Sequence, residues 1–515
     1  MKGYRKLLSV LLVCSMLVAM PSSETLAADI AAGYENTGAD AAAEVPAETE
    51  ENVMESDTGA KEQKGSETEE MASEEDGGEK ETGETVSENN GLEDEEAGKD
   101  ETGGTGDGIE DGGIEKALGS DIGITTVAAD ASGICGENVT WRFEDGTLVI
   151  SGNGDMQDNL SDLEQPWKNL YKSIETAVIE EGVTHIGAYA FSMCEHLNSV
   201  EIANSVTSIG KEAFRYCGTL SEIILPAGLT EIERGAFDNC AGLTNIILPN
   251  GVITIGELAF NCCTNLESIT LPEGMTTIGA EAFNHCIGLT EVRIPDSVET
   301  IEWGAFRGCA GLAYVKLPNG LTAIDAAIFH GCTSLTGMAI PDSVTLINTR
   351  AFAGCSALTG ITIPSGVKAI GEGAFSGCSG LTGLEIPYGV AVIGSYAFTG
   401  CTGLTSIAIP DSVTNIEEGA FSSCIGLADI TIPDSVTYIT PWMLSGCTGL
   451  ASIKIPDGVE RIEKYAFSDC TNLHYIIMPR RVTYIEENAF RDSGLADVYY
   501  SGDESDWDAI NIRPN

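Results

Sequence analysis

The chain has 515 residues, of which 79 are acidic and 26 are basic, and its formal net charge is −53. A balance this acidic argues against nucleic acid as a partner, because phosphate binding needs clustered lysine and arginine. Anionic membrane surfaces would repel such a chain for the same reason.

The first residues have the pattern of an export signal. Residues 2–6 contain two lysines and an arginine, residues 7–20 form an apolar run, and Pro21 ends that run ahead of a Leu-Ala-Ala sequence at 26–28. The apolar run is shorter than a comfortable membrane span. We therefore predict a signal peptide over residues 1–28, no integral contact with the membrane after its cleavage, and a protein that is secreted or associated with the cell surface.

An acidic segment follows the predicted signal peptide. Residues 29–120 hold 30 acidic and five basic side chains but almost no large apolar ones. Such a segment cannot bury enough apolar surface to offset its chain entropy, so we predict a disordered spacer over residues 29–121. Its role is open between a stalk that holds the folded part away from the cell and a solubilising tail without a specific partner.

The next segment predicts a β-hairpin. In residues 139–150, apolar residues alternate with polar ones on both sides of Asp145-Gly146, a dipeptide typical of hairpin turns. We expect this hairpin, together with Pro166-Trp167, to form an N-terminal cap over residues 122–173.

The main part of the chain is a repeat of 23 residues with the pattern F-x-x-C-x-x-L-x-x-I-x-I-P-x-x-V-x-x-I-x-x-x-A. Phenylalanine recurs every 23 residues from Phe191 to Phe421 and again at Phe467 and Phe490, and Leu444 occupies the one gap. A fixed period of this length is typical of a solenoid. We predict a mainly β repeat solenoid of about 14 turns over residues 174–496, whose stability is shared between neighbouring turns.

One repeat shows the expected course of the chain. In residues 283–305, Val292 should lie on a first short strand with its side chain pointing inward, and Pro295 should close that strand because proline has no N–H to donate. Ile301 should lie on a second short strand. Ala305 and Phe306 should then pack inward on a short helical or 3₁₀ turn.

The last residues depart from the repeat. Residues 497–515 contain Tyr499, Tyr500 and Trp507 outside the 23-residue pattern. We predict a C-terminal cap in which these aromatic side chains cover the apolar face of the last turn.

The pattern C-x-x-L-x-x-I-x-I-P-x-x-V-x-x-I-G-x-x-A-F resembles the BspA-type leucine-rich repeat of bacterial surface proteins. The flanking stretches ICGENVTW and VYYSGDESDWDAI are similar to those that often enclose such arrays. The resemblance covers roughly residues 134–515. It implies a right-handed leucine-rich-repeat solenoid that is exported by a bacterium and acts as an adhesin for host matrix proteins or other cells.

The cysteines recur with the repeat from Cys194 to Cys470, three residues after each phenylalanine or, at Cys447, after Leu444. Neighbouring thiols in such a column would have parallel Cβ vectors about 4.8 Å apart. A disulfide needs Cβ atoms about 3.8 Å apart and side chains turned toward each other. We therefore predict buried, reduced thiols, with Cys262 as the most exposed thiol and Cys135 without a partner. A linear column does not suit the tetrahedral geometry of zinc, so no metal site is expected.

We find no arrangement that predicts catalysis. The five histidines (His185, His196, His285, His330 and His474) occupy different positions of the repeat, and no zinc-protease, serine-hydrolase or phosphate-loop motif is present. A repeat surface offers no closed cleft for paired carboxylates. Asn153, Asp155 and Asp158 are more consistent with a solvated turn than with a calcium site. We predict a protein without catalytic residues or cofactors.

The candidate binding site is the row of outward side chains on the first strands, because packing does not determine their identity. Arg293, Tyr314 and Lys316 would form a small basic and aromatic patch, and tyrosine and arginine often anchor binding. The predicted binding residues are Glu291, Arg293, Tyr314, Lys316, Glu385, Lys454 and Tyr475. The expected partner is a protein or glycan on a host or microbial surface. The alternatives are an ordinary solvated face, a self-associating envelope or matrix protein, and a hydrolase.

Overall fold

The computed structural model describes residues 5–6 and 131–513. The predicted signal peptide, apart from Arg5–Lys6, and the predicted acidic spacer lie outside these residues. Arg5–Lys6 form the two-residue strand β1, which pairs antiparallel with β31 (Asp497–Tyr500).

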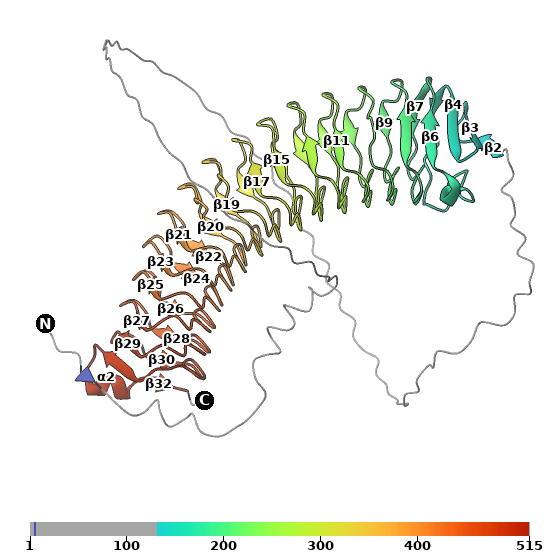
Figure 1. Cartoon of the computed structure of the whole chain (residues 1–515). Helices are drawn as coiled ribbons and strands as arrows, with labels where there is room; N and C mark the ends of the chain where they lie inside the picture. The colour runs from blue at the N-terminus through green and yellow to red at the C-terminus, as the bar shows by residue number, and fades with distance from the viewer. Residues whose placement is uncertain (1–4, 7–130, 514–515) are drawn as a thin grey trace, which may run out of the picture. The chain divides into compact units, whose positions relative to one another are not determined.

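The repeats form a stack of 23-residue turns, here called rungs, which confirms the predicted mainly β solenoid (Figure 1). Each rung contributes up to two short strands, and most of these strands pair in parallel with the equivalent strand of a neighbouring rung, in several short sheets. Ile246 thus faces Ile269 on the first strands, and Ile278 faces Ile301 on the second strands. Because this step equals the repeat length, equivalent side chains of successive rungs lie side by side.

The first strands carry the outward side chains of interest. They are β6 (Thr176–Ile179), β8 (Ser199–Ile202), β11 (Asn245–Ile247), β13 (Ser268–Thr270), β15 (Glu291–Arg293), β17 (Tyr314–Lys316), β21 (Gly383–Glu385), β23 (Ser406–Ala408), β25 (Asp429–Thr431), β27 (Ser452–Lys454), β29 (Tyr475–Met478) and β31. In β15, β17 and β21 the middle residue is buried and the two flanking residues are exposed, as the alternation of a strand requires.

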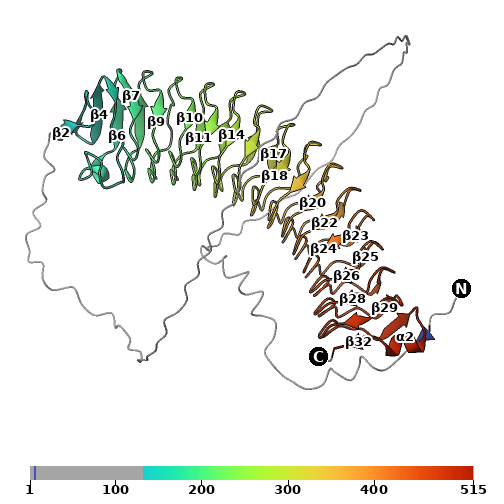
Figure 2. The same ribbon diagram turned by 180° about the vertical axis from the view of Figure 1, so that it is seen from behind.

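The second strands follow one another in chain order along the other side of each rung, as β20 to β28 show in Figure 2. They are β7 (Val183–Ile186), β9 (Ser208–Ile209), β10 (Glu231–Ile232), β12 (Thr254–Ile255), β14 (Thr277–Ile278), β16 (Thr300–Ile301), β18 (Ala323–Ile324), β19 (Leu346–Ile347), β20 (Ala369–Ile370), β22 (Val392–Ile393), β24 (Asn415–Ile416), β26 (Tyr438–Ile439), β28 (Arg461–Ile462), β30 (Tyr484–Ile485) and β32 (Asn511–Ile512).

The predicted role of the proline is confirmed. Pro295 lies two residues after the end of β15, where the lack of an N–H costs no ladder bond. The N–H of Val298 donates to the carbonyl of Pro295 at 3.1 Å and closes a turn that leads to β16.

The segment that ends each rung is not the predicted helical or 3₁₀ turn. In the first rung, Tyr189 (φ 57°) and Met193 (φ 63°) both adopt the left-handed conformation, and equivalent residues of later rungs do the same. The N–H groups of Tyr189, Phe191 and Met193 donate to carbonyls of the next rung at 2.7–2.9 Å, whereas that of Ser192 bonds locally to Tyr189. The alternation gives this edge its own ladder between rungs, which a helix could not provide because a helix satisfies its N–H groups internally.

The core of the solenoid is a column of stacked phenylalanines. From Phe191 to Phe421 successive ring centroids lie 5.2–6.0 Å apart, and the rings are within 18° of parallel. Every one of these rings is fully buried. Spacings in this range are favourable for aromatic pairs, so the column ties each rung to its neighbours.

The N-terminal cap contains the predicted hairpin. The strands β3 (Val139–Glu144) and β4 (Thr147–Gly152) pair antiparallel, β2 (Ala131–Ile134) pairs with β3, and β4 pairs in parallel with β6. The cap continues with β5 (Gly154–Asp155) and the 3₁₀ turn η1 (Tyr171–Ser173). Trp167 is buried, donates from Nε1 to the carbonyl of Ala190 at 2.9 Å, and lies 5.7 Å from the ring of Phe191. Trp167 therefore extends the aromatic column into the cap.

The other end of the stack is closed by β31, the helix α2 (Glu504–Asp508) and β32. The strand β31 pairs with β29, and β32 pairs with β30. Tyr500 is buried, and its ring meets that of Trp507 edge to face at 5.4 Å. Two of the three predicted aromatic residues thus pack together at this end.

Candidate functional site

Four of the seven predicted binding residues lie together on the first strands, on a surface that we call the first-strand patch (Glu291, Arg293, Tyr314 and Lys316). The parallel pairing of β15 with β17 places Glu291 beside Tyr314 and Arg293 beside Lys316. The guanidinium carbon of Arg293 lies 5.1 Å from the centroid of the Tyr314 ring, within the range of a cation–π contact. All four side chains are exposed.

The charged groups of the first-strand patch make only long ion pairs with neighbouring side chains. Arg293 lies 3.8 Å from the Glu291 carboxylate, and the Lys316 ammonium lies 3.4 Å from Asp296. Surface pairs of this length contribute little to stability. The side chains therefore keep unused hydrogen-bonding capacity toward a partner.

The remaining predicted residues lie apart from that patch. Glu385 is exposed on β21, several rungs away. Lys454 and Tyr475 lie on the neighbouring strands β27 and β29, and the ring of Tyr475 meets that of Tyr499 edge to face at 5.5 Å. The structure thus places Lys454 and Tyr475 on adjacent strands, where they face Ile477 and Ser452 respectively, and joins neither of them nor Glu385 to the first-strand patch.

Two exposed isoleucines on the same face are absent from our predictions. Ile224 is 85% exposed, and Ile247, one repeat later, is 70% exposed. Both occupy the outward position that Arg293 and Lys316 occupy in later rungs. The sequence alone could have indicated these two residues, because an apolar side chain at an outward position of the repeat does not pack into the core.

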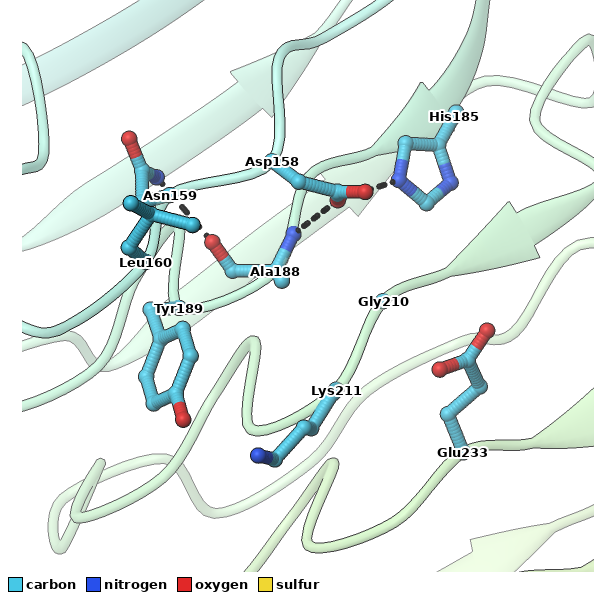
Figure 3. A pocket seen from close by; sticks show the side chains of 9 residues that line it. All are labelled: Asp158, Asn159, Leu160, His185, Ala188, Tyr189, Gly210, Lys211 and Glu233. Carbon is cyan, nitrogen blue, oxygen red and sulfur yellow. Dashed lines mark hydrogen bonds and ion pairs between the residues drawn. The ribbon is translucent and has the colours of Figure 1, made fainter.

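A pocket of about 340 Å³ lies where the cap meets the first rungs (Figure 3). Its walls come from the cap loop (Asp158, Asn159 and Leu160), the first rung (His185, Ala188 and Tyr189) and the next two rungs (Gly210, Lys211 and Glu233). The repeat pattern did not predict this pocket, because the cap loop does not follow the 23-residue period.

His185 forms a hydrogen-bonded bridge at one wall of the pocket. Its Nε2 lies 3.0 Å from Oδ1 of Asp158, and its Nδ1 lies 2.7 Å from the hydroxyl of Ser208. Asp158 also accepts the backbone N–H of Ala188 at 2.7 Å. This N–H, followed by the bond to His185, holds the pKa of Asp158 below its usual value. Asp155 and Asp158 remain exposed, in line with the predicted solvated turn, but both also bond to the first rung, Asp155 by accepting the hydroxyl of Thr184.

Glu233 and Lys211 form the opposite side of the pocket. Burial, followed by the charge of Glu231, raises the pKa of Glu233, and the nearby backbone N–H of Lys211 offsets part of this rise. The ammonium of Lys211 lies 5.5 Å from the centroid of the Tyr189 ring and 3.7 Å from Glu212. The pocket therefore contains side chains of both signs.

The order Ser208, His185, Asp158 is that of a nucleophile, a base and an orienting acid. Acyl transfer also needs N–H donors aimed at the developing oxyanion. Around this pocket the backbone N–H groups of Asn159, Leu160, Ala188, Tyr189 and Gly210 all donate to protein oxygens. These five N–H groups are engaged within the protein, and the bridge through His185 joins the cap to the first two rungs.

The cysteine column is buried and every cysteine between residues 131 and 513 is a free thiol, as predicted. Only Cys262 among them is partly exposed. Burial raises the pKa of Cys309 to about 12, so its reactive thiolate form is strongly disfavoured. Within the same residues, no group of three or more histidine, cysteine or carboxylate side chains is placed to hold a metal ion.

No helix within the described residues 131–513 is both long enough and apolar enough to cross a bilayer. The two helical segments in this range, η1 and α2, have three and five residues.

Comparisons with known proteins identify the repeat. The family model of the BspA type leucine rich repeat region matches residues 168–290, 276–405 and 391–505. No curated protein sequence matches the chain.

Several solved structures are similar. A leucine-rich repeat protein from Bacteroides ovatus is 24% identical, with a TM-score of 0.51 over 71% of this chain and 99% of that one. A leucine-rich repeat protein from Eubacterium ventriosum is 24% identical (TM-score 0.44; 71% and 96% covered). A leucine rich cell surface protein from Faecalibacterium prausnitzii is 28% identical (TM-score 0.37; 73% and 96% covered). The first of these likenesses supports the same fold. Since the family model spans well over half of the residues, the chain belongs to the BspA type leucine-rich repeat family.

Proposed function

We propose that the protein is an exported, non-enzymatic binding scaffold that presents the outward side of its first strands to a protein or glycan on a host or microbial surface. The observation that carries the proposal is the contrast between the buried and exposed positions of β15 and β17. Their middle residues, Val292 and Val315, repeat the core pattern, whereas Arg293 and Tyr314 are exposed and differ from rung to rung.

Family membership and the predicted signal peptide support the same proposal. The solenoid displays many outward positions on one continuous scaffold, which is how repeat proteins provide extended binding surfaces. Because Arg293 rests on the Tyr314 ring, less side-chain entropy is lost on binding than for a free arginine.

The test is capture of surface proteins and glycans from host and bacterial cells on the immobilised chain, followed by the same capture with a triple variant (Arg293→Ala, Tyr314→Ala and Lys316→Ala). We expect a captured partner to be lost from the variant. A matched control is Arg461→Ala with Tyr484→Ala, because Arg461 also lies over a tyrosine ring, at 4.5 Å, but on the second strands. Equal capture by both variants would contradict a role for the first-strand patch.

Self-association is a competing function that the exposed pair Ile224 and Ile247 favours. Apolar side chains on one face of a solenoid can meet those of a second copy. Sedimentation velocity of the full chain and of Ile224→Ser with Ile247→Ser distinguishes the two functions. A concentration-dependent oligomer that the double substitution dissolves would favour self-association over capture of a different partner.

A further inference from the structure

The pocket at the cap lies where the repeat is interrupted. Within the array each rung stacks on a near copy of itself, so equivalent side chains fill the space between them. Pairing between β5 and β7 shifts its register at Gly154 and Asp155, and the loop that follows belongs to no rung. The hollow between this loop and the first rungs therefore cannot be filled by a repeating side chain.

The charged side chains that line the pocket disfavour the binding of both simple anions and bare cations. Asp158 and Glu233 present carboxylates, which would repel an anionic ligand. Lys211 lines the same pocket with an ammonium group on the side of Tyr189, so a bare cation would meet a charge of its own sign there (Figure 3). A ligand whose groups can each both donate and accept hydrogen bonds fits both kinds of side chain, and hydroxyl groups have that property.

The pocket also offers apolar surface. The Tyr189 ring and the Leu160 side chain line it, and Leu160 is 83% exposed. A sugar ring combines hydroxyl groups at its edge with a face of C–H groups, so it can use both kinds of wall. A volume of about 340 Å³ lies at the lower end of the range for small-molecule sites, which suits one or two sugar rings.

We propose that this pocket binds a neutral saccharide residue, with Lys211 donating to ligand hydroxyls, Glu233 accepting from them, and Tyr189 contacting the C–H face. The site is separate from the first-strand patch, so it does not depend on the function proposed above.

One observation gives Glu233 a structural role as well. Glu302 occupies the same repeat position and accepts the backbone N–H of Ala280 at 2.9 Å, and the backbone N–H of Lys211 holds the equivalent place near Glu233. Glutamine can accept the same bond. Glu302→Gln is therefore a matched control for Glu233→Gln, since it changes the same backbone bond away from the pocket.

Lysine has a matched control too. Lys464 occupies the repeat position of Lys211, and its ammonium lies 4.8 Å from the centroid of the Trp442 ring. Lys464→Ala removes a lysine–aromatic contact without touching the pocket.

The experiment is saturation-transfer NMR on the full chain with glucose, galactose, mannose and N-acetylglucosamine, and with glucosamine as a cationic comparison. We expect at least one neutral sugar to bind, with an affinity roughly tenfold weaker for Lys211→Ala and for Glu233→Gln, since each change removes a charged hydrogen-bond partner. Lys464→Ala and Glu302→Gln should bind as the unchanged protein does.

Three results would overturn the proposal: no signal from any neutral sugar, binding of glucosamine alone, or equal binding by the pocket variants and their controls. Thermal melts of each variant accompany the titrations. If Glu233→Gln does not fold, Lys211→Ala decides the outcome, because Lys211 is partly exposed and its partner Glu212 keeps shorter ion pairs with Arg215 and Arg234.

Discussion

Each of the repeat cysteines from Cys217 to Cys470 fills a small space in the core and also donates its S–H group. Cys309 donates to the carbonyl of Phe283, 26 residues earlier, at 3.0 Å. The spacing of the cysteines predicted the buried column but not this bond. The position of the acceptor carbonyl depends on left-handed backbone residues, which turn it toward the next rung. These residues include Tyr189 and Met193, and because neither is glycine the sequence does not mark them as left-handed.

Replacing Cys309 by alanine should therefore cost more than the loss of a small apolar group. The change leaves a void and removes one of the two donors to the Phe283 carbonyl, which keeps the backbone N–H of Cys286, and we expect the free energy of unfolding to fall by about 1–2 kcal/mol. The measurement is the denaturant midpoint. Cys262→Ala is the control, because Cys262 is only partly buried and its sulfur makes one long contact of 3.6 Å to Asn261. Equal shifts in the two variants would show that the S–H bond contributes nothing.

The carboxylate of Asp158 should make stability depend on pH. Its pKa is lowered in the folded state, chiefly by the N–H of Ala188, so it stabilises the fold at pH above its unfolded pKa of about 3.9. This contribution is lost as the pH falls through the lower, folded pKa. We expect Asp158→Asn to melt at a lower temperature than the unchanged protein at pH 6, and the gap to narrow toward pH 3. Asp411→Asn, in an exposed turn, is the control, and a gap that stays constant with pH would contradict the prediction.

At the scale of one rung, residues next to the phenylalanine column change its geometry. Most rungs place alanine before the ring, but Ile328 precedes Phe329. The widest ring spacing in the column, 6.0 Å, lies between Phe306 and Phe329, and the largest tilt, 18°, follows it. A larger neighbour thus moves the ring without interrupting the column, and the 23-residue pattern alone could not predict a shift of this size.

In the rung without a phenylalanine, two adjacent core positions differ from the common alanine–phenylalanine pair in opposite ways, the first side chain being larger and the second smaller. Met443 and Leu444 stand where neighbouring rungs have alanine and phenylalanine, and both are fully buried. We expect Met443→Ala and Leu444→Phe each to destabilise the protein by about 1–3 kcal/mol, the first through a cavity and the second through overpacking. The double variant restores the common pair, so its loss should be much smaller than the sum.

The measurement is a double-mutant cycle on denaturant midpoints. The control cycle pairs Met443→Ala with Cys262→Ala, which lies many rungs away, and its effects should add. Additive losses for Met443 and Leu444 would show that the two side chains do not share one space.

At the scale of the whole molecule, the 23-residue period predicted the contacts that recur from rung to rung but not the contacts made by segments outside the repeat. The parallel rungs, the inward phenylalanines and the exposed Arg293 follow from spacing alone, because equivalent residues meet one repeat apart. The bridge between Asp158 and His185 joins residues 27 positions apart, off the period, and so does the pocket beside it. Contacts between a cap and a repeat array need the course of the cap loop, which no spacing rule supplies.

The same distinction predicts how the protein responds to deletions. Removal of residues 352–374 takes out one rung and joins Ala351 to Phe375, which keeps the order of alanine and phenylalanine and lets the flanking rungs stack. We expect a soluble protein with a small loss of stability, because each rung interacts mainly with its neighbours.

Removal of residues 494–515 takes out a similar length of chain, but from the end of the stack, and deletes β31, β32 and the buried Tyr500. The strands β29 and β30 would then present unpaired edges and an open apolar end, so this variant should aggregate. Circular dichroism and light scattering on both variants measure the difference, and a soluble cap deletion beside an aggregated rung deletion would show that stability does not pass from neighbour to neighbour.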